Sequence, residues 1–172
     1  MKYLTNDMVE ELFEKYNTPS NVIEHCKAVR DVAVAIGKEL NTHGYDLDIG
    51  LINGAAYAHD FIRVMPKHDV TGASLLMEYG FVREAAIVLV HMRYPQFSPM
   101  DKINETDIVC LADRLVKDDQ YVGLDERIDY VIAKINDPAK TPGILRSKNN
   151  AQKFIDGVEK ICKKSIKEIV NV

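Results

Sequence analysis

The chain has 172 residues, of which 47% are hydrophobic and 28% are charged. This length and composition are typical of one globular domain, and they exclude an intrinsically disordered chain, a collagen-like fibre and a disulfide-rich scaffold. The formal net charge of −4 at pH 7 gives no strong attraction to nucleic acids or anionic membranes, although it leaves room for a local basic pocket.

The chain shows no signal for export or for membrane insertion. Residues 1–16 carry acidic residues every few positions, so they lack the continuous apolar region of a signal peptide. The longest apolar stretch, residues 85–90, is far shorter than the roughly 18 residues that span a bilayer. Cys26, Cys110 and Cys162 are odd in number and match no zinc pattern. We therefore expect a cytoplasmic protein with reduced thiols and no membrane contact.

Apolar residues recur at spacings of three and four along nearly the whole chain, which is the period of amphipathic helices. Seven segments show this period with recognisable ends, at residues 20–40, 47–61, 66–80, 81–92, 105–117, 124–135 and 147–170. Ser20 or Asn21 is expected to cap the first helix and Asn104 the fifth, and Gly80 is expected to end the third. No segment alternates as a strand does. The sequence therefore predicts an all-α fold, a compact bundle of seven or eight helices.

Residues 1–172 are expected to form a single domain. Its core is expected at about 20–118, with the helices at about 124–170 packing on it. The loop at 136–142 is the only candidate boundary, and it lies too close to the end of the chain to define a second domain. The apolar stripe of the last helix is expected to pack on its own domain, while a homo-oligomer stays open.

Histidine and aspartate residues interrupt the apolar faces of four expected helices. His25 lies on the stripe of the first helix, His59 and Asp60 end the second, His91 follows the apolar residues of the fourth, and Asp113 has apolar neighbours in the fifth. Each alone has an ordinary explanation, as a core histidine or as the partner of a nearby basic residue. Together they indicate a shared site, because a buried aspartate is costly unless it is paired or bound to a metal.

Imidazole nitrogens and carboxylate oxygens suit iron, manganese, zinc, nickel or cobalt, and no thiolate is required. Asp60 has two oxygens and can bridge two divalent ions. The other candidate ligands then divide between the ions: His25, His59 and Asp113 for one, His68 and His91 for the other. Three or four protein ligands on each ion leave room for a reactive hydroxide. His43 lies in the polar turn 41–44 and is expected at the surface.

These residues stand in recognisable local sequences. They are His25 in VIEHCKAVR, His59 and Asp60 in GAAYAHDFIR, His68 in HDVTGASLLMEYG, His91 in AAIVLVHM and Asp113 in IVCLADRLVK. In this order the sequence resembles the HD-domain superfamily of metal-dependent phosphohydrolases, in its extended version with ligands for two ions. The family pattern has a lone histidine before Gly-Ala, so the resemblance carries over His68 without Asp69. A site with one ion stays open.

The resemblance implies hydrolysis of a phosphate ester or anhydride by a metal-bound hydroxide, with a nucleotide or another small phosphorylated metabolite as the substrate. Asp60 would bridge the ions and orient the hydroxide, and Arg63, about one turn further on, is the preferred catalytic cation. Candidate phosphate-binding residues are Arg63, Lys67, Arg93 and Lys117, each with the alternative of a solvated surface charge. No P-loop and no nucleophilic triad pattern is present.

Two other functions fit the same ligands. Some HD-domain proteins with this ligand set hold two irons and oxidise their substrates with oxygen. A third possibility is a non-catalytic nucleotide-binding or accessory module, since similar domains occur beside nucleotidyltransferases. An oxygenase requires redox-active iron, whereas a hydrolase is expected to work with several ions.

Overall fold

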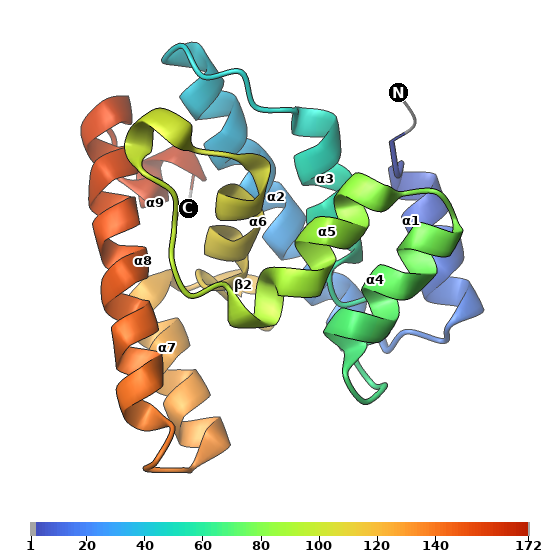
Figure 1. The fold of residues 1–172 in the computed structure, drawn as a ribbon. Coiled ribbons are helices and arrows are strands. Elements are labelled where there is room, and N and C mark those ends of the chain that lie inside the picture. Colours follow the sequence, from blue (N-terminus) through green and yellow to red (C-terminus); the bar gives the residue numbers. More distant parts are fainter. Residues whose placement is uncertain (1–2, 172) are drawn as a thin grey trace.

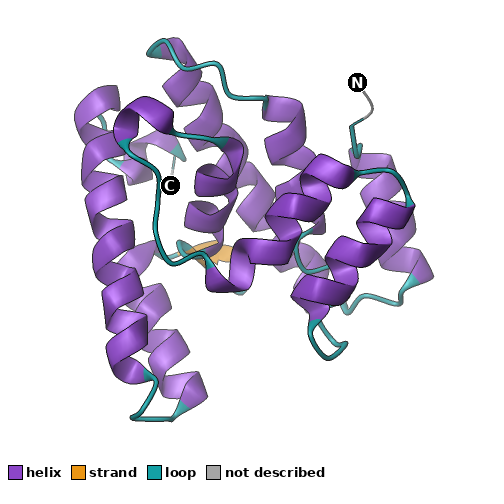
Figure 2. Ribbon diagram, viewed as in Figure 1, coloured by secondary structure: helices purple, strands orange, loops and turns teal. Residues whose placement is uncertain are grey.

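Helices account for most of residues 3–171, which the computed structural model describes, and the expected all-α class is confirmed (Figures 1 and 2). The α-helices are α1 (Asn6–Lys15), α2 (Ser20–Thr42), α3 (Ile49–Ala58), α4 (His68–Glu78), α5 (Val82–Val90), α6 (Glu105–Asp113), α7 (Gly123–Ile135), α8 (Thr141–Cys162) and α9 (Ile166–Ile169). The short elements are the 3-10 helices η1 (His91–Arg93) and η2 (Met100–Lys102) and the strands β1 (Val116–Lys117) and β2 (Gln120–Tyr121).

The longest central helix, α2, follows the predicted apolar stripe. Val29, Ala33, Ile36 and Leu40 are buried on one face, at helical spacing. Helices α3 and α6 pack against this face. At Gly37 a side chain would meet the Ile52 Cδ1 atom at 2.9 Å, so the glycine permits the close approach of α2 and α3. The core therefore forms around α2, which also carries His25 towards its beginning.

The carboxyl-terminal part of the chain differs in its details from the prediction. Helix α8 begins at Thr141 rather than 147, because Pro142 occupies the first turn, where a missing N–H costs nothing. Lys163 has φ of 53° and ends α8, and Ser165 caps the separate helix α9. With this division and α1, the residues described contain nine α-helices rather than seven or eight.

A short hairpin replaces the end of the helix expected at 105–117. Helix α6 begins after the capping residue Asn104, as predicted, but it stops at Asp113. Strands β1 and β2 then pair antiparallel through a turn at Asp118, whose φ is 52°. This left-handed backbone is tolerated best by glycine, asparagine and aspartate.

The helices are arranged with α2, α3 and α6 near the middle, α1, α4 and α5 to one side, and the long pair α7 and α8 along the other side (Figure 1). Helix α8 packs on the rest of the molecule through a stacked contact between Phe154 and Phe97, whose ring centroids are 4.6 Å apart. No helix among residues 3–171 has the length and apolar character that crossing a membrane requires.

Candidate metal centre

Five helix ends or faces bring the predicted ligands to one place. The side chains come from the first part of α2, the residues directly after α3, the first residue of α4, the start of η1 and the end of α6: His25, His59, Asp60, His68, His91 and Asp113. Their donor atoms form two groups, and the atoms of each group lie within 4.8 Å of one another. The groups are His25, His59 and Asp113, and Asp60, His68 and His91.

The carboxylate of Asp60 lies between the two groups. Its Oδ2 atom is 3.4 Å from His59 Nε2 and 4.0 Å from His25 Nε2. Its Oδ1 atom is 3.1 Å from His68 Nε2 and 3.5 Å from His91 Nε2. Each oxygen therefore faces a different group, as a bridging carboxylate requires.

Backbone carbonyls orient three of the imidazole rings. The Nδ1 atoms of His59 and His91 lie 2.8 Å and 2.6 Å from the carbonyl oxygens of Ala56 and Val88, one turn earlier in the chain. When Nδ1 donates its hydrogen to these carbonyls, the lone pair of Nε2 points into the site. Such a second partner commonly fixes the tautomer of a metal-binding histidine.

His25 is oriented in the same way from a distant part of the chain. Its Nδ1 atom is 2.8 Å from the carbonyl oxygen of Asp118, at the turn of the β1–β2 hairpin. Its Nε2 atom is 3.2 Å from Asp113 Oδ1. The hairpin that sequence analysis missed thus takes part in the site.

The site contains polar atoms whose hydrogen-bonding capacity is unused. Among residues 3–171, the buried side-chain atoms without a hydrogen-bond partner are His59 Nε2, Asp60 Oδ1, His68 Nε2 and His91 Nε2. An unpaired buried polar atom costs about 1–3 kcal/mol. Four such atoms, divided between the two neighbouring donor groups, are explained by bound cations, so the donor set fits one or two divalent metals.

The charges of these residues are strongly coupled. Burial favours the neutral form of His59, but the neighbouring Asp60 carboxylate outweighs burial and holds the pKa of His59 well above its usual value. Burial also favours the neutral form of Asp60, yet the imidazoles of His59, His68 and His91 hold the pKa of this carboxyl well below its usual range. The pKa of Asp113 is likewise lowered against the effect of burial, chiefly by His25 and His59. Both aspartates are therefore ionised at neutral pH, as metal ligands would need to be.

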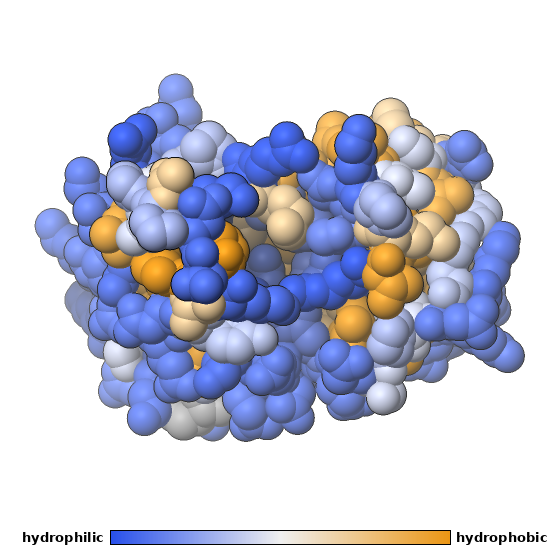
Figure 3. All heavy atoms as spheres, turned by 90° about the horizontal axis from the view of Figure 1, so that it is seen from below, coloured by the Kyte–Doolittle hydropathy of each residue, from blue (hydrophilic) through white to orange (hydrophobic). Residues whose placement is uncertain are grey.

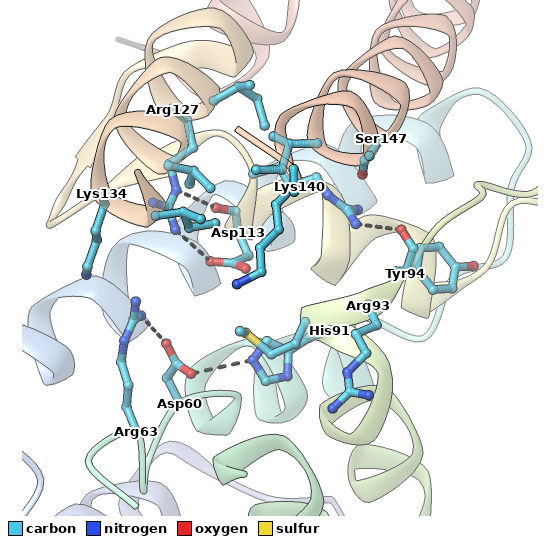
Figure 4. Close-up of a pocket in the computed structure, with 18 residues that line it drawn as sticks. Asp60, Arg63, His91, Arg93, Tyr94, Asp113, Arg127, Lys134, Lys140 and Ser147 are labelled. Carbon is cyan, nitrogen blue, oxygen red and sulfur yellow. Dashed lines mark hydrogen bonds and ion pairs between the residues drawn. The ribbon is translucent and has the colours of Figure 1, made fainter. Parts of the chain in front are cut away.

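A cavity of about 670 Å³ opens beside this centre. Asp60, His91 and Asp113 contribute to its wall (Figure 4). Basic side chains also line it: Arg63, Arg93, Arg114, Arg127, Lys134 and Lys140. Seen from below, the surface is hollowed near the middle of the molecule, with both hydrophilic and hydrophobic atoms around the hollow (Figure 3). The arrangement can hold an anionic ligand directly beside the candidate metal ligands.

The predicted phosphate-binding residues fall into two pairs. Arg63 forms an ion pair with Asp60 and lines the cavity, and Arg93 lines it further along (Figure 4). Lys67 is exposed where α4 begins, and Lys117 lies 3.1 Å from Glu126. These two lysines are not among the residues that line the cavity.

Two residues that the sequence did not single out also contribute to the site. The carbonyl of Asp118 orients His25, and Arg127 on α7 lies 3.8 Å from Asp113 Oδ1. The pair Asp118-Asp119 between Lys117 and Gln120 was a signal for a two-residue turn. Arg127 carries no comparable signal, because a charged residue in an amphipathic helix is normally on the solvent face.

A further trio of potential ligands lies away from the cavity. Glu39, His43 and Cys162 also have donor atoms within 4.8 Å of one another. The Glu39 carboxylate is already held by Lys164 at 2.8 Å, and His43 is exposed, as expected. This trio therefore does not resemble the main centre, and a substitution in it can serve as a control when bound metal ions are counted.

The comparisons with known proteins agree with this geometry. The model of the HD domain matches residues 22–118, which include all six candidate ligands and more than half of the chain. The chain belongs to the HD-domain superfamily of metal-dependent phosphohydrolases, as the resemblance implied.

Two curated relatives are recognisable at the level of sequence. An uncharacterized protein of Methanocaldococcus jannaschii is 27% identical over 124 residues, which cover 63% of this chain and 73% of the relative. A tRNA (cytidine(56)-2′-O)-methyltransferase of Thermoplasma volcanium is 30% identical over 135 residues, which cover 69% of this chain but only 38% of the relative. No solved structure matches the chain.

Proposed function

We propose that the protein hydrolyses a phosphate ester or anhydride of a small phosphorylated metabolite, such as a nucleotide. The observation that carries this proposal is the set of four buried, unpaired donor atoms beside a cavity lined by basic residues. Membership of the HD-domain family supports this proposal, because the members of that family are generally metal-dependent phosphohydrolases.

The six residues His25, His59, Asp60, His68, His91 and Asp113 are proposed to hold two divalent ions, one for each group of donors. Iron, manganese, zinc, nickel and cobalt all accept imidazole and carboxylate ligands. A divalent ion bound there lowers the pKa of a coordinated water towards neutrality and attracts the oxygens of a phosphoryl group.

The chain's own residues position the reacting groups. Asp60 faces both groups of donors and thereby fixes their separation. Arg63, paired with Asp60 and one-third exposed towards the cavity, is proposed to bind a phosphoryl oxygen and to neutralise charge that develops there. Arg93 is proposed to bind another part of an anionic substrate from the rim.

The proposal is tested by measuring phosphate release from nucleotides and p-nitrophenyl phosphate by protein loaded with manganese, iron or cobalt. Asp60→Asn is expected to lose activity by at least about 100-fold, because one ligand is shared by both groups. Asp101→Asn, at an exposed position outside the cavity, serves as the control. Full turnover by Asp60→Asn contradicts the proposal.

The same preparation distinguishes hydrolysis from oxidation. A hydrolase releases phosphate without oxygen, and it also does so when a further sample is loaded with redox-inert zinc. Phosphate release that requires iron and oxygen, accompanied by oxygen uptake, supports the oxygenase instead. Tight nucleotide binding without turnover under every metal supports a non-catalytic module.

We also propose a cytoplasmic location. Cys26, Cys110 and Cys162 are free and buried, which suits a reducing compartment.

A further inference from the structure

Helices α7 and α8 lie outside the part of the chain that matches the family model, yet they build much of the cavity. The match ends at residue 118, and α7 begins at Gly123. More than half of the residues that line the large cavity come from α7, α8 and the loop between them. These helices face the metal centre from the opposite wall (Figure 4). They are therefore placed to contact the part of a substrate that points away from the reacting phosphoryl group.

The wall that α7 and α8 present is largely apolar. Ile128, Val131 and Ile135 line the cavity from α7, and Ile144 lines it from α8. An apolar wall offers no hydrogen bonds to a second phosphate, but it favours a flat or apolar organic body.

Three cations stand within or beside this wall. Arg127 is held in place at Asp113, where its Nε atom donates to the backbone carbonyl at 3.4 Å. Lys134 lines both the large cavity and a smaller adjoining one of about 130 Å³. Lys140 lies 3.3 Å from Asp137, and its side chain is two-thirds exposed and extends towards the cavity (Figure 4).

The two lysines differ from the arginines in their partners. Arg63 and Arg127 are each paired with a candidate metal ligand. Lys134 contacts the Tyr130 ring at 5.7 Å, and among residues 3–171 no carboxylate lies within ion-pair distance of it. The charge of Lys134 is therefore available to bind an anion in the cavity. Lys140 can bind the same anion when it breaks its exposed ion pair with Asp137.

We propose that α7 and α8 recognise the non-reacting part of the substrate, and that this part combines an apolar body with a second anionic group. The apolar body lies against Ile128, Val131 and Ile144, and Lys134 and Lys140 bind the second anion. The inference rests on the proposed function, because it takes the first anion to be the phosphoryl group at the metal centre.

The test compares the binding of adenosine 3′,5′-bisphosphate and adenosine 5′-monophosphate to metal-loaded protein by calorimetry. The wild-type protein is expected to bind the bisphosphate about tenfold more tightly, the value of one charge-assisted contact. The double variant Lys134→Ala, Lys140→Ala is expected to lose this preference, so that it binds the bisphosphate and the monophosphate with equal affinity. Lys153→Ala, on α8 but outside the cavity, is the matched control.

A second variant tests the apolar wall separately. Val131→Ala is expected to weaken both nucleotides by the same factor, about threefold, and to leave the binding of inorganic pyrophosphate unchanged. Equal weakening of pyrophosphate contradicts an apolar contact with the organic body. Circular dichroism of each variant checks that it is folded.

The outcomes separate this inference from the proposed function, since binding is measured without turnover. A bisphosphate preference that the lysine variant abolishes supports the inference, even if neither nucleotide is hydrolysed. Equal affinity of wild-type protein for the two nucleotides overturns it, even if both are hydrolysed. A preference that survives in the double variant also overturns it.

Discussion

At the scale of the residue, the proposed chemistry depends on a few side chains. Asp60 faces both donor groups, and Arg63 joins Asp60 to the cavity. Burial lowers the pKa of the Arg63 guanidinium, but the Asp60 carboxylate outweighs it and raises that pKa, so Arg63 stays charged. Arg63 therefore lies next to the candidate metal ligands and can also contact a substrate in the cavity.

Replacing Arg63 therefore tests catalysis separately from metal binding. Arg63→Gln is expected to lower kcat/KM by about 100-fold, a typical loss for one group that stabilises charge in a transition state. Metal content is expected to stay as in the wild type, because Arg63 donates no ligand. Lys67→Gln, which lies outside the cavity, is the control and is expected to be near wild type. An unchanged kcat/KM for Arg63→Gln refutes the role of this residue.

The sequence predicted the candidate metal ligands better than it predicted the groups that hold those ligands in place. Most candidate ligands were visible because a polar residue stood on an apolar helix face, as His25 and His91 do, whereas His68, at the start of α4, was selected by the family resemblance. The carbonyl of Asp118 was not visible, because every residue has a carbonyl and only the fold selects one. Arg127 was missed because its contact with Asp113, at the end of α6, depends on where the tertiary fold places α7, which periodicity does not show.

At the scale of the element, one buried carboxylate organises the segment between η1 and α6. Asp107 is fully buried and accepts hydrogen bonds from the Tyr94 hydroxyl and from the backbone N–H groups of Ser98 and Asn104, at 2.8 to 3.0 Å. Tyr94 in turn lines the cavity. The segment is therefore tied to the first turn of α6.

We expect Asp107→Ala to lower the free energy of unfolding by about 3 kcal/mol, because it leaves three donors without their acceptor. Urea denaturation monitored by circular dichroism measures this change. Asp101→Ala, at an exposed position in η2, is expected to change the stability by less than about 0.5 kcal/mol. A loss of similar size in both variants contradicts the assigned role of Asp107.

A close contact between α3 and the amino-terminal segment gives a second prediction at this scale. A Cβ atom at Gly54 would lie 2.6 Å from the backbone oxygen of Leu4, which has little room to move. Gly54→Ala is expected to destabilise the protein by about 2 kcal/mol. Gly143→Ala, where a Cβ atom meets nothing within 4 Å, is expected to be neutral or stabilising by up to about 1 kcal/mol. Thermal or urea unfolding of the two variants compares them directly.

Some helix ends follow from local sequence signals, whereas others depend on tertiary contacts. Asn104 and Gly80 act as predicted, because their capping and left-handed turns depend on the residue itself. The predicted cap at Ser20 or Asn21 was wrong, since Ser20 is already the first residue of α2 and Pro19 precedes it without a side-chain capping bond. The start of α8 was misplaced because Pro142 was taken as part of a loop, although proline also fits the first turn of a helix. The end of α6 and the β1–β2 hairpin depend on tertiary pairing, which a helical period in 105–117 does not exclude.

At the scale of the whole molecule, the candidate ligands hold separate elements together. They come from α2, α4, η1, α6 and the segment after α3, so an ion that binds them bridges much of the fold. A ligand that binds only the folded state stabilises it by mass action.

We expect saturating manganese or cobalt to raise the unfolding temperature by about 5 to 10 °C, the shift for a ligand at about 100 times its dissociation constant. A chelator is expected to reverse the shift. His91→Ala is expected to reduce it, whereas the exposed His43→Ala keeps it in full. A shift that disappears in His43→Ala places the stabilising ion at Glu39 and Cys162 instead.

The most direct test of the central claim is a count of metal ions per chain by elemental analysis after reconstitution and removal of free metal. We predict two ions for the wild type and for His43→Ala, a loss of the second ion in His68→Ala, and a loss of both in Asp60→Ala. A wild-type protein that retains no ion, or an Asp60→Ala variant that retains two, would contradict a metal centre bridged by Asp60.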